Sequence, residues 1–242
     1  MQVRPLSTAL KCFEVLEVVA DQPQAVSISE LGRLIGESRA TAYQRLLTLT
    51  TAGWLERAPD GRYRLSTRAC RIAVAALEQA GFGERAQPIL DELAEESGEA
   101  VSLVVLENDC IVIARRAESR GILRADLKVG VAVSFKDSSS GAIWLAFGPD
   151  DLKSRLTRAG VELPSTAQIK RVRAEGIAIG GGGKTLPGIR AIAVPVLDVR
   201  GKCVASLSIS TPENRFEPRR YAPAMTNASR RLADVAAGQD LR

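Results

Sequence analysis

The spacing of apolar residues in the first 65 positions predicts three short helices followed by a hairpin. In Leu6–Ala20 apolar residues recur every three or four positions, which predicts an amphipathic helix with one inward stripe. We expect the stripe to consist of Leu10, Phe13, Leu16 and Val19. Across all three helices and the hairpin, the expected core leucines are Leu31, Leu34, Leu46, Leu49 and Leu55.

Polar residues mark the ends of the second and third helices. Ser27–Glu30 has the pattern of a capping box, in which a serine and a glutamate three residues later satisfy free amides at a helix start. Gly36 suits the turn after that helix. Ser38 suits the cap of the next helix, and Gly53 suits its end. The sequence therefore predicts two helices joined by a tight turn.

Two short strands follow the third helix. They are expected at Trp54–Arg57 and Arg62–Leu65, and Pro59–Gly61 between them has strong turn chemistry. Two helices joined by a turn and followed by a small hairpin are typical of a winged helix–turn–helix that binds duplex DNA. The alternative is a three-helix module that binds a protein.

Several side chains of this segment suit contact with DNA. Cationic groups bind phosphates and make affinity salt-dependent, whereas exposed polar groups on a helix read base edges. The expected phosphate contacts are Arg39 at the start of the third helix and Arg57, Arg62 and Arg64 in the hairpin. The expected base-facing or flanking residues are Ala40, Thr41, Tyr43, Gln44 and Thr48, with Arg45 extending its head toward phosphate from the flank of the apolar face. For each residue the alternative is an ordinary solvated side chain.

Composition narrows the possible chemistry. The chain has 242 residues, a net charge of +5 and no histidine. The charge favours a polyanionic partner mildly, and the missing histidine excludes Ser-His-Asp and Cys-His catalysis and histidine-ligated metals. No cofactor or metal is expected. The sequence has neither an apolar run of about eighteen residues nor a signal-peptide pattern, so we expect a cytoplasmic protein.

The four cysteines leave one enzymatic alternative open. Cys12, Cys70, Cys110 and Cys203 show no metal or redox spacing. A small enzyme would use Cys110 or Cys203 as a nucleophile with a carboxylate as the base. A pure dimerisation or scaffold module is a third hypothesis, which the arginine-rich hairpin disfavours.

The segment after the hairpin predicts a linker. Ser66–Ala80 is apolar around most of a helix, so it needs more than one packing partner: its own DNA-binding domain and a second subunit. Gly81–Gly83 then interrupts the helix. We expect a DNA-binding domain at 1–66, a linker helix at 67–83 and a second domain at 84–242.

The second domain alternates strands and helices in a way that predicts an antiparallel α+β fold. The expected strands are Val101–Leu106, Ile111–Ala117, Leu123–Val129, Val131–Phe135, Ala191–Leu197 and Cys203–Ser210. The expected helices are Glu84–Ser97, Gly141–Phe147, Asp150–Arg158, Thr166–Glu175 and Pro218–Ala237. Gly180–Gly183 is expected to be a mobile loop.

The ordered set of motifs resembles the IclR family of bacterial transcription regulators. In the first domain the resemblance lies in Ser29–Leu31, Ser38–Tyr43, Gly53 and Gly61–Leu65. In the second domain it lies in Pro88–Gly98, Val129–Gly130, Ser138–Ala146, Gly188–Asp198 and Leu207–Ser210. The chain departs from the family pattern at Gly141–Ile143, where Gly-Lys-Ala is frequent, and at Gln44, where an arginine is usual.

The resemblance implies a GAF-like effector domain, a homodimer or tetramer, and a palindromic operator near a catabolic gene. It implies a small-molecule effector, such as an organic or aromatic carboxylate or a sugar acid. Carried over by position, the effector-binding residues are Ser138, Ser140, Gly141, Ala142, Ala191, Ser208 and Ser210. Alternatively, these serines belong to a capped loop and a solvated strand face. Arg115, Arg116, Arg120 and Arg124 either pair with an anionic ligand or form a solvated face.

Overall fold

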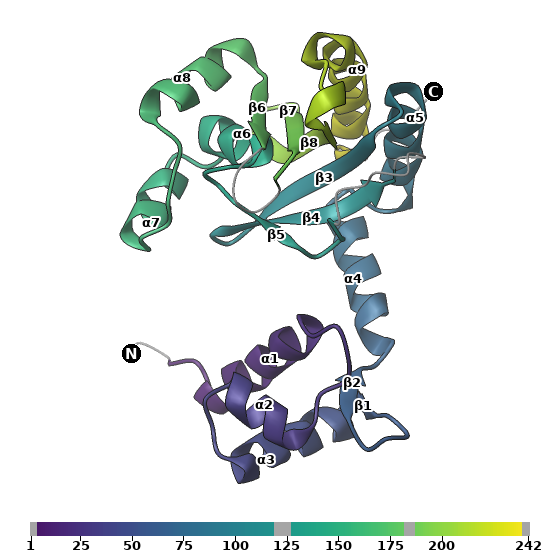
Figure 1. Cartoon of the computed structure of the whole chain (residues 1–242), viewed down its shortest axis with the longest axis vertical. Coiled ribbons are helices and arrows are strands. Elements are labelled where there is room, and N and C mark those ends of the chain that lie inside the picture. Colours follow the sequence, from purple (N-terminus) through teal and green to yellow (C-terminus); the bar gives the residue numbers. More distant parts are fainter. Residues whose placement is uncertain (1–3, 119–126, 182–186, 239–242) are drawn as a thin grey trace. The chain divides into compact units, whose positions relative to one another are not determined.

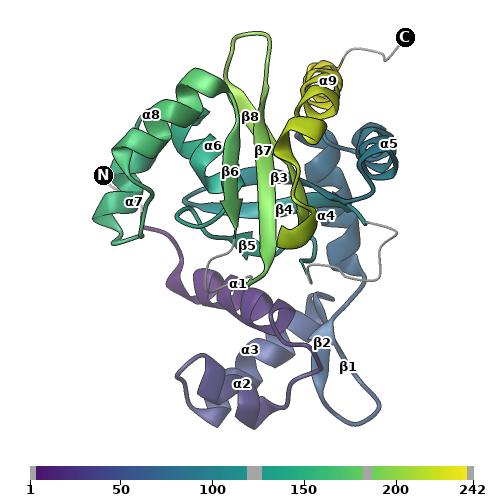
Figure 2. The ribbon, with the colours of Figure 1, turned by 45° about the horizontal axis from the view of Figure 1, so that its top comes forward.

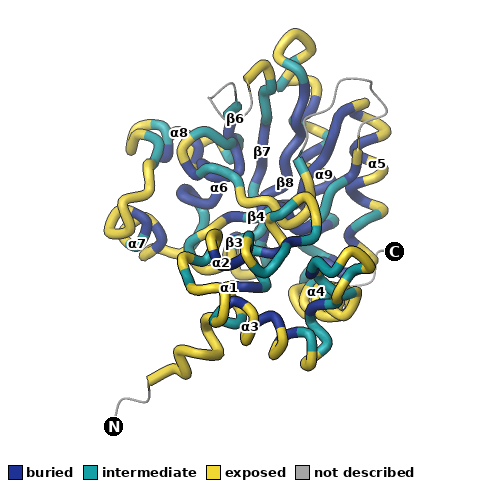
Figure 3. The backbone as a smooth tube through the Cα atoms, turned by 60° about the horizontal axis from the view of Figure 1, so that its bottom comes forward, coloured by how far each residue is buried: buried dark blue, intermediate teal, exposed yellow. Residues whose placement is uncertain are grey.

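The computed structural model describes residues 4–118, 127–181 and 187–238, which form two compact units, Met1–Ala76 and Leu77–Arg242. Each unit has its own core. The helix α4 (Arg68–Gln79) spans the division between them, and none of its residues is buried (Figure 3). Its side chains Ile72 and Val74 are 47% and 53% exposed, so the expected apolar faces of this helix are bare in the single chain.

The first unit confirms the three helices and the hairpin (Figure 1). Its elements are α1 (Ser7–Ala20), α2 (Ile28–Leu34), α3 (Arg39–Thr51), β1 (Leu55–Arg57) and β2 (Tyr63–Leu65). Both parts of the capping box on Ser27 and Glu30 are formed, and the Ser38 hydroxyl accepts the Thr41 amide. The hairpin pairs Leu55 with Leu65 in antiparallel register. We call Leu55–Leu65 the wing.

The core of the first unit corrects part of the predicted apolar stripe. Leu31, Leu46, Leu49 and Leu55 are buried as expected. On α1, Val19 is buried and Leu16 packs against this core, as expected. Leu10 and Phe13, however, are 55% and 57% exposed, and Val15, one turn before Val19, is buried instead. Leu34, at the end of α2, is also exposed.

The second unit has a six-stranded antiparallel sheet, which confirms the predicted α+β fold (Figure 2). The strand order is β5-β4-β3-β8-β7-β6. The strands are β3 (Ala100–Glu107), β4 (Cys110–Ala117), β5 (Ala132–Val133), β6 (Ala178–Gly181), β7 (Ile189–Leu197) and β8 (Cys203–Pro212). The helices are the short η1 (Glu84–Ala86) and η2 (Glu213–Arg215), and α5 (Gln87–Ser97), α6 (Ser139–Phe147), α7 (Leu152–Arg158), α8 (Thr166–Glu175) and α9 (Pro218–Ala236).

The two faces of the sheet pack against different helices. One face, with Leu103 and Leu207, forms a core with α5 and α9. The opposite face, with Val104 and Ile113, forms a core with α6, α7 and α8. Because the side-chain period of a strand is two residues, neighbours in sequence such as Leu103 and Val104 enter different cores.

Three predictions for this domain need correction. The strand expected at Val131–Phe135 is reduced to Ala132–Val133, and Leu127–Val129 is not strand; the rest of the expected Leu123–Val129 strand lies outside the described residues. Gly180 and Gly181, expected in a mobile loop, are paired with Ala191 and Arg190 in β6. The other two glycines of that tract lie outside the described residues.

Glycine is required where α6 begins. A Cβ on Gly141 would lie 2.5 Å from the Phe135 backbone, and a Cβ on Gly180 would lie 2.4 Å from the Ser139 nitrogen. The Gly181 amide also donates to the Asp137 carbonyl at 2.8 Å. These contacts hold the first turn of α6 directly against β6.

Gly141→Ala is expected to lower the free energy of unfolding by about 1–3 kcal/mol, although alanine is the better helix former, because the added methyl overlaps the Phe135 backbone. Thermal and urea unfolding measure this change. An unchanged or raised stability would show that α6 does not approach Phe135 this closely.

Candidate DNA interface and effector cavity

The third helix presents one continuous exposed face. We call Ala40, Tyr43, Gln44, Leu47 and Thr48 the reading face, because all five are exposed and lie at helical spacing. Leu47 is 51% exposed and was not among the expected contacts. Thr41 is half-buried, and its hydroxyl lies 2.9 Å from that of Ser38. The Thr48 hydroxyl donates to the Gln44 carbonyl at 2.8 Å.

The arginines of this unit differ in what they already bind. Arg39 is exposed and, among the described residues, makes no hydrogen bond or ion pair. Arg57 is exposed and donates weakly to the Gly61 carbonyl at 3.4 Å. Arg64 is paired with Glu56 across the wing at 2.7 Å, with both side chains largely exposed. All three remain accessible to a phosphate.

Arg62 and Arg45 are tied to the protein itself. Arg62 donates to the Glu30 carboxylate at 2.9 Å and to the Ala25 carbonyl at 2.8 Å, so it fastens the wing to the start of α2. Arg45 has a side chain only 10% exposed and binds Glu37. The predicted reach of Arg45 toward phosphate is therefore replaced by an internal ion pair.

Hydrogen bonds lower the pKa of both carboxylates that hold these arginines. The pKa of Glu30 falls from 4.5 to about 2, chiefly because the Ser27 amide and hydroxyl and then Arg62 bind its ionised form. The hydrogen bond from Lys11, followed by that from Arg45, lowers the pKa of Glu37. Both carboxylates therefore stay ionised near neutral pH.

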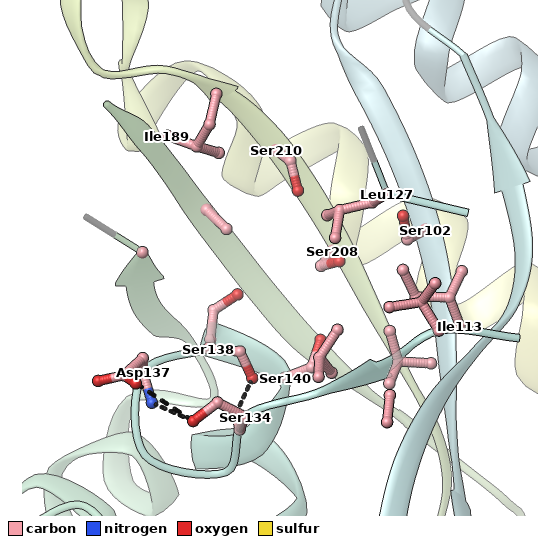
Figure 4. Close-up of a pocket in the computed structure, with 17 residues that line it drawn as sticks. Ser102, Ile113, Leu127, Ser134, Asp137, Ser138, Ser140, Ile189, Ser208 and Ser210 are labelled. Carbon is pink, nitrogen blue, oxygen red and sulfur yellow. Dashed lines mark hydrogen bonds between the residues drawn. The ribbon is translucent and has the colours of Figure 1, made fainter. Parts of the chain in front are cut away.

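The second unit contains a cavity of about 280 Å³ between the sheet and the start of α6 (Figure 4). We call it the serine cavity. Its apolar wall includes Val104, Ile113, Leu127, Val133, Ile189 and Ala191. Its hydroxyl groups come from two sides: Ser102, Ser208 and Ser210 from the sheet, and Ser134, Ser138, Ser139 and Ser140 from the segment that leads into α6.

The structure brings together five of the seven expected effector residues. Ser138, Ser140, Ala191, Ser208 and Ser210 line the cavity. The other two, Gly141 and Ala142, do not line it: the Gly141 amide is capped by the Ser138 hydroxyl, and Ala142 is packed in the core.

Sequence reasoning missed four polar residues of this cavity: Ser102, Ser134, Asp137 and Ser139. Ser102 interrupts the apolar run Val101–Leu103, and it pairs with Ser208 on the neighbouring strand. A polar residue inside a buried strand is the signal that points to Ser102. Asp137 is the one charged residue among those that line the cavity in the described chain.

The arginine cluster expected near the sheet is divided between its two faces. The Arg115 guanidinium donates to the Phe82 carbonyl at 2.5 Å, on the α5 side. Arg116 donates to the Ser102 hydroxyl at 2.8 Å and to Glu118 at 2.7 Å, and its side chain is only 3% exposed. Neither forms the solvated face that was considered. Arg120 and Arg124 lie outside the described residues.

The cysteine-nucleophile alternative lacks a suitable thiol at Cys203. This side chain is buried, and desolvation raises its pKa to about 12, so it stays protonated. Cys110 is exposed at the start of β4. In the described part of the chain, no group of three or more acidic, cysteine or histidine side chains is placed to hold a metal, and no helix is long and apolar enough to cross a membrane.

Comparison with known proteins identifies the family. A family model described as "Bacterial transcriptional regulator IclR C-terminal" matches residues 74–235, and one described as "IclR helix-turn-helix domain" matches residues 8–59. A winged helix–turn–helix unit joined to an effector domain defines a ligand-responsive, DNA-binding transcriptional regulator rather than an enzyme. The chain belongs to the IclR family.

One curated relative and two solved structures illustrate the match. The Pca regulon regulatory protein of Pseudomonas putida is 30% identical over 94% of this chain and 83% of its own. An IclR regulator structure from Alicyclobacillus acidocaldarius has a TM-score of 0.83 at 21% identity, covering 96% of this chain and all of that one. An IclR homologue from Microbacterium hydrocarbonoxydans, complexed with 4-hydroxybenzoate, has a TM-score of 0.80 at 19% identity, covering 96% and 100%.

Glu30→Gln is expected to destabilise the first unit and to remove part of its acid sensitivity. Because the folded-state pKa of Glu30 is lowered, its ionised form contributes stability above pH about 4.5, and that contribution is lost as the pH falls toward about 2. Unfolding followed at several pH values between these limits tests this. A variant with the same pH dependence as the natural chain would contradict the hydrogen bonds that Ser27 and Arg62 donate to the Glu30 carboxylate.

Proposed function

We propose that this regulator controls a catabolic or metabolite-responsive gene in the cytoplasm, through an operator bound by α3 and the wing, and that a small organic acid in the serine cavity changes its operator affinity. The observation that carries the proposal is that cavity, where an apolar wall faces hydroxyl donors on two sides. Residues 1–66 would form the DNA-binding domain, 67–83 the linker helix and 84–242 the effector domain.

The DNA side of the proposal rests on exposure and charge. The reading face is free of internal packing, and Gln44 can make a bidentate contact with adenine. Leu47 and the Thr41 methyl group offer apolar contact to thymine methyls. Arg39, Arg57 and Arg64 flank this face as phosphate contacts, whereas Arg45 and Arg62 support it from within.

The proposal includes a homodimer or tetramer on a palindromic operator. The bare apolar residues of α4 support it, because a helix without buried residues gains stability by packing against a second copy. A two-fold assembly would present two reading faces to two half-sites about one helical turn apart, or a multiple of that spacing. Effector binding would then favour one spacing by about 1–3 kcal/mol.

The effector side of the proposal rests on the donors in the cavity. Ser208 and Ser210 make no hydrogen bond among the described residues, although both are at least 90% buried. Ser140 accepts a hydrogen bond from Ser206 at 3.1 Å, which leaves its own proton available. Donors without acceptors suit a ligand rich in oxygen, and a homologue's complex with 4-hydroxybenzoate supports an aromatic or aliphatic carboxylate.

Arg39→Ala and Arg57→Ala are each expected to weaken binding to any duplex and to reduce the slope of log K against log salt by about one unit, because each removes one phosphate contact. Fluorescence anisotropy between about 50 and 200 mM salt measures both effects. Arg171→Ala, which removes an exposed arginine of α8, is the charge-matched control. Equal slopes for all variants would contradict the assigned interface.

Ser208→Ala and Ser210→Ala are each expected to reduce the affinity for the effector about 3- to 10-fold, because each removes one hydrogen-bond donor from the cavity. A thermal-shift screen of small carboxylates, followed by calorimetric titration, identifies the effector and measures the loss. Ser154→Ala on the exposed surface of α7 is the matched control. Undiminished binding to both cavity variants would place the effector elsewhere.

A further inference from the structure

The hydroxyl of Ser102 can still donate one hydrogen bond into the cavity. Ser102 is 2% exposed and lines the serine cavity from β3. Its oxygen accepts a hydrogen bond from the Arg116 guanidinium at 2.8 Å, and no other hydrogen bond involves this hydroxyl among the described residues. A hydroxyl has one proton to donate, so with its oxygen engaged from behind, its proton is available to an acceptor in the cavity.

A β-bulge places the Arg116 cation behind Ser102. The register of β3 and β4 shifts between Leu103 and Val104, so that Ser102 is paired with Arg116. Without the shift, continuous pairing from Val104 with Ile113 would bring Arg115 opposite Ser102. The bulge thus selects which guanidinium lies on the cavity face, which is a recognised effect of such insertions.

A second donor lies beside the first. Ser102 and Ser208 are directly paired across β3 and β8, so their side chains share one face of the sheet. Cβ atoms of such a pair are about 5 Å apart, a spacing at which two hydroxyls can each donate to one oxygen of a carboxylate. At the α6 side of the cavity, Asp137 brings a negative charge instead, and Figure 4 shows Ser102 and Asp137 on opposite sides of this view.

We propose that Ser102 and Ser208, with Arg116 behind Ser102, form the subsite that binds the negatively charged end of the effector. The uncharged end then lies toward Asp137 and the start of α6. Arg116 acts as a positioning residue, because its guanidinium orients and polarises the Ser102 hydroxyl without lining the cavity. This assignment rests on the proposed function, since it takes the effector to be an organic acid in the serine cavity.

The test compares carboxylates with their neutral amides. Calorimetric titration of the full-length protein with benzoate, 4-hydroxybenzoate and pyruvate, and with the three corresponding amides, gives the preference for charge. In Ser102→Ala and in Arg116→Met the affinity for the carboxylate is expected to fall about 10-fold, whereas the affinity for the amide changes much less. The preference for the carboxylate over the amide is then largely lost. Arg116→Lys, which keeps the cation, is expected to retain part of the preference.

Arg115→Met is the matched control, because Arg115 is the neighbouring arginine on the opposite face and donates to the Phe82 carbonyl. It should leave the preference for carboxylate unchanged. If Arg116→Met does not fold, as judged by circular dichroism, Ser102→Ala decides the question.

The outcomes separate the two proposals. If the natural protein binds none of the three carboxylates, both the effector class of the proposed function and this subsite are overturned. If it binds them, and Ser208→Ala weakens binding while Ser102→Ala leaves the carboxylate preference intact, the proposed function stands and the charged-end assignment is wrong.

Discussion

The effector domain depends on one constraint: a buried hydroxyl must find a hydrogen-bond partner or lose the hydration it had in water. One face of β3 and β8 carries four buried serines, although aliphatic side chains there would need no hydrogen-bond partners. They are Ser102, Ser206, Ser208 and Ser210. The Ser206 hydroxyl donates a hydrogen bond to Ser140, and the Ser102 hydroxyl accepts one from Arg116. The two that find no partner among the described residues line a cavity of about 280 Å³. The sheet is therefore less tightly packed at this cavity, where a bound ligand can accept the hydrogen bonds of the serine hydroxyls.

In the DNA-binding unit, internal carboxylates decide which cations face outward. Glu30 holds both the start of α2 and Arg62, and Glu37 holds both Lys11 and Arg45. Glu30 ties the wing to α2, and Glu37, in the turn after α2, ties α1 and α3 together, while Arg39 and Arg57 form no ion pair within the part of the chain described here. Scaffold and contact surface thus use the same residue type. Arg45 and Arg62 serve the scaffold through Glu37 and Glu30, whereas Arg64, although paired with Glu56, stays exposed on the wing.

Local patterns in the sequence were sufficient for most of the fold. Capping residues at Ser27 and Ser38 and the turn at Pro59–Gly61 act over a few positions, so the helices and the wing could be predicted. The partners of Arg62 and Arg116 lie 32 and 14 residues away, and no local pattern specifies them. Gly180 looked like part of a loop because glycine is common there, yet its role is to let α6 approach β6. Ser102 and Leu47 were overlooked because each differs in polarity from its surroundings. Ser102 is a polar residue in a buried strand, and Leu47 is an apolar residue on an exposed helix face. The sequence alone does not give the neighbouring strand or the exposure that explains such a residue.

The bulge in β4 also has a consequence for how the sheet reaches its alignment. A slip of one position that paired Arg115 with Ser102 would pair Arg116 with Val101, whose side chain lies in the core beneath α5 and α9. A guanidinium at that position would lose part of its hydration, which costs free energy unless it finds a hydrogen-bond partner. In the bulged alignment both arginines have one: Arg115 donates to the Phe82 carbonyl, and Arg116 donates to the Ser102 hydroxyl and Glu118. The two adjacent arginines therefore favour the bulged strand register.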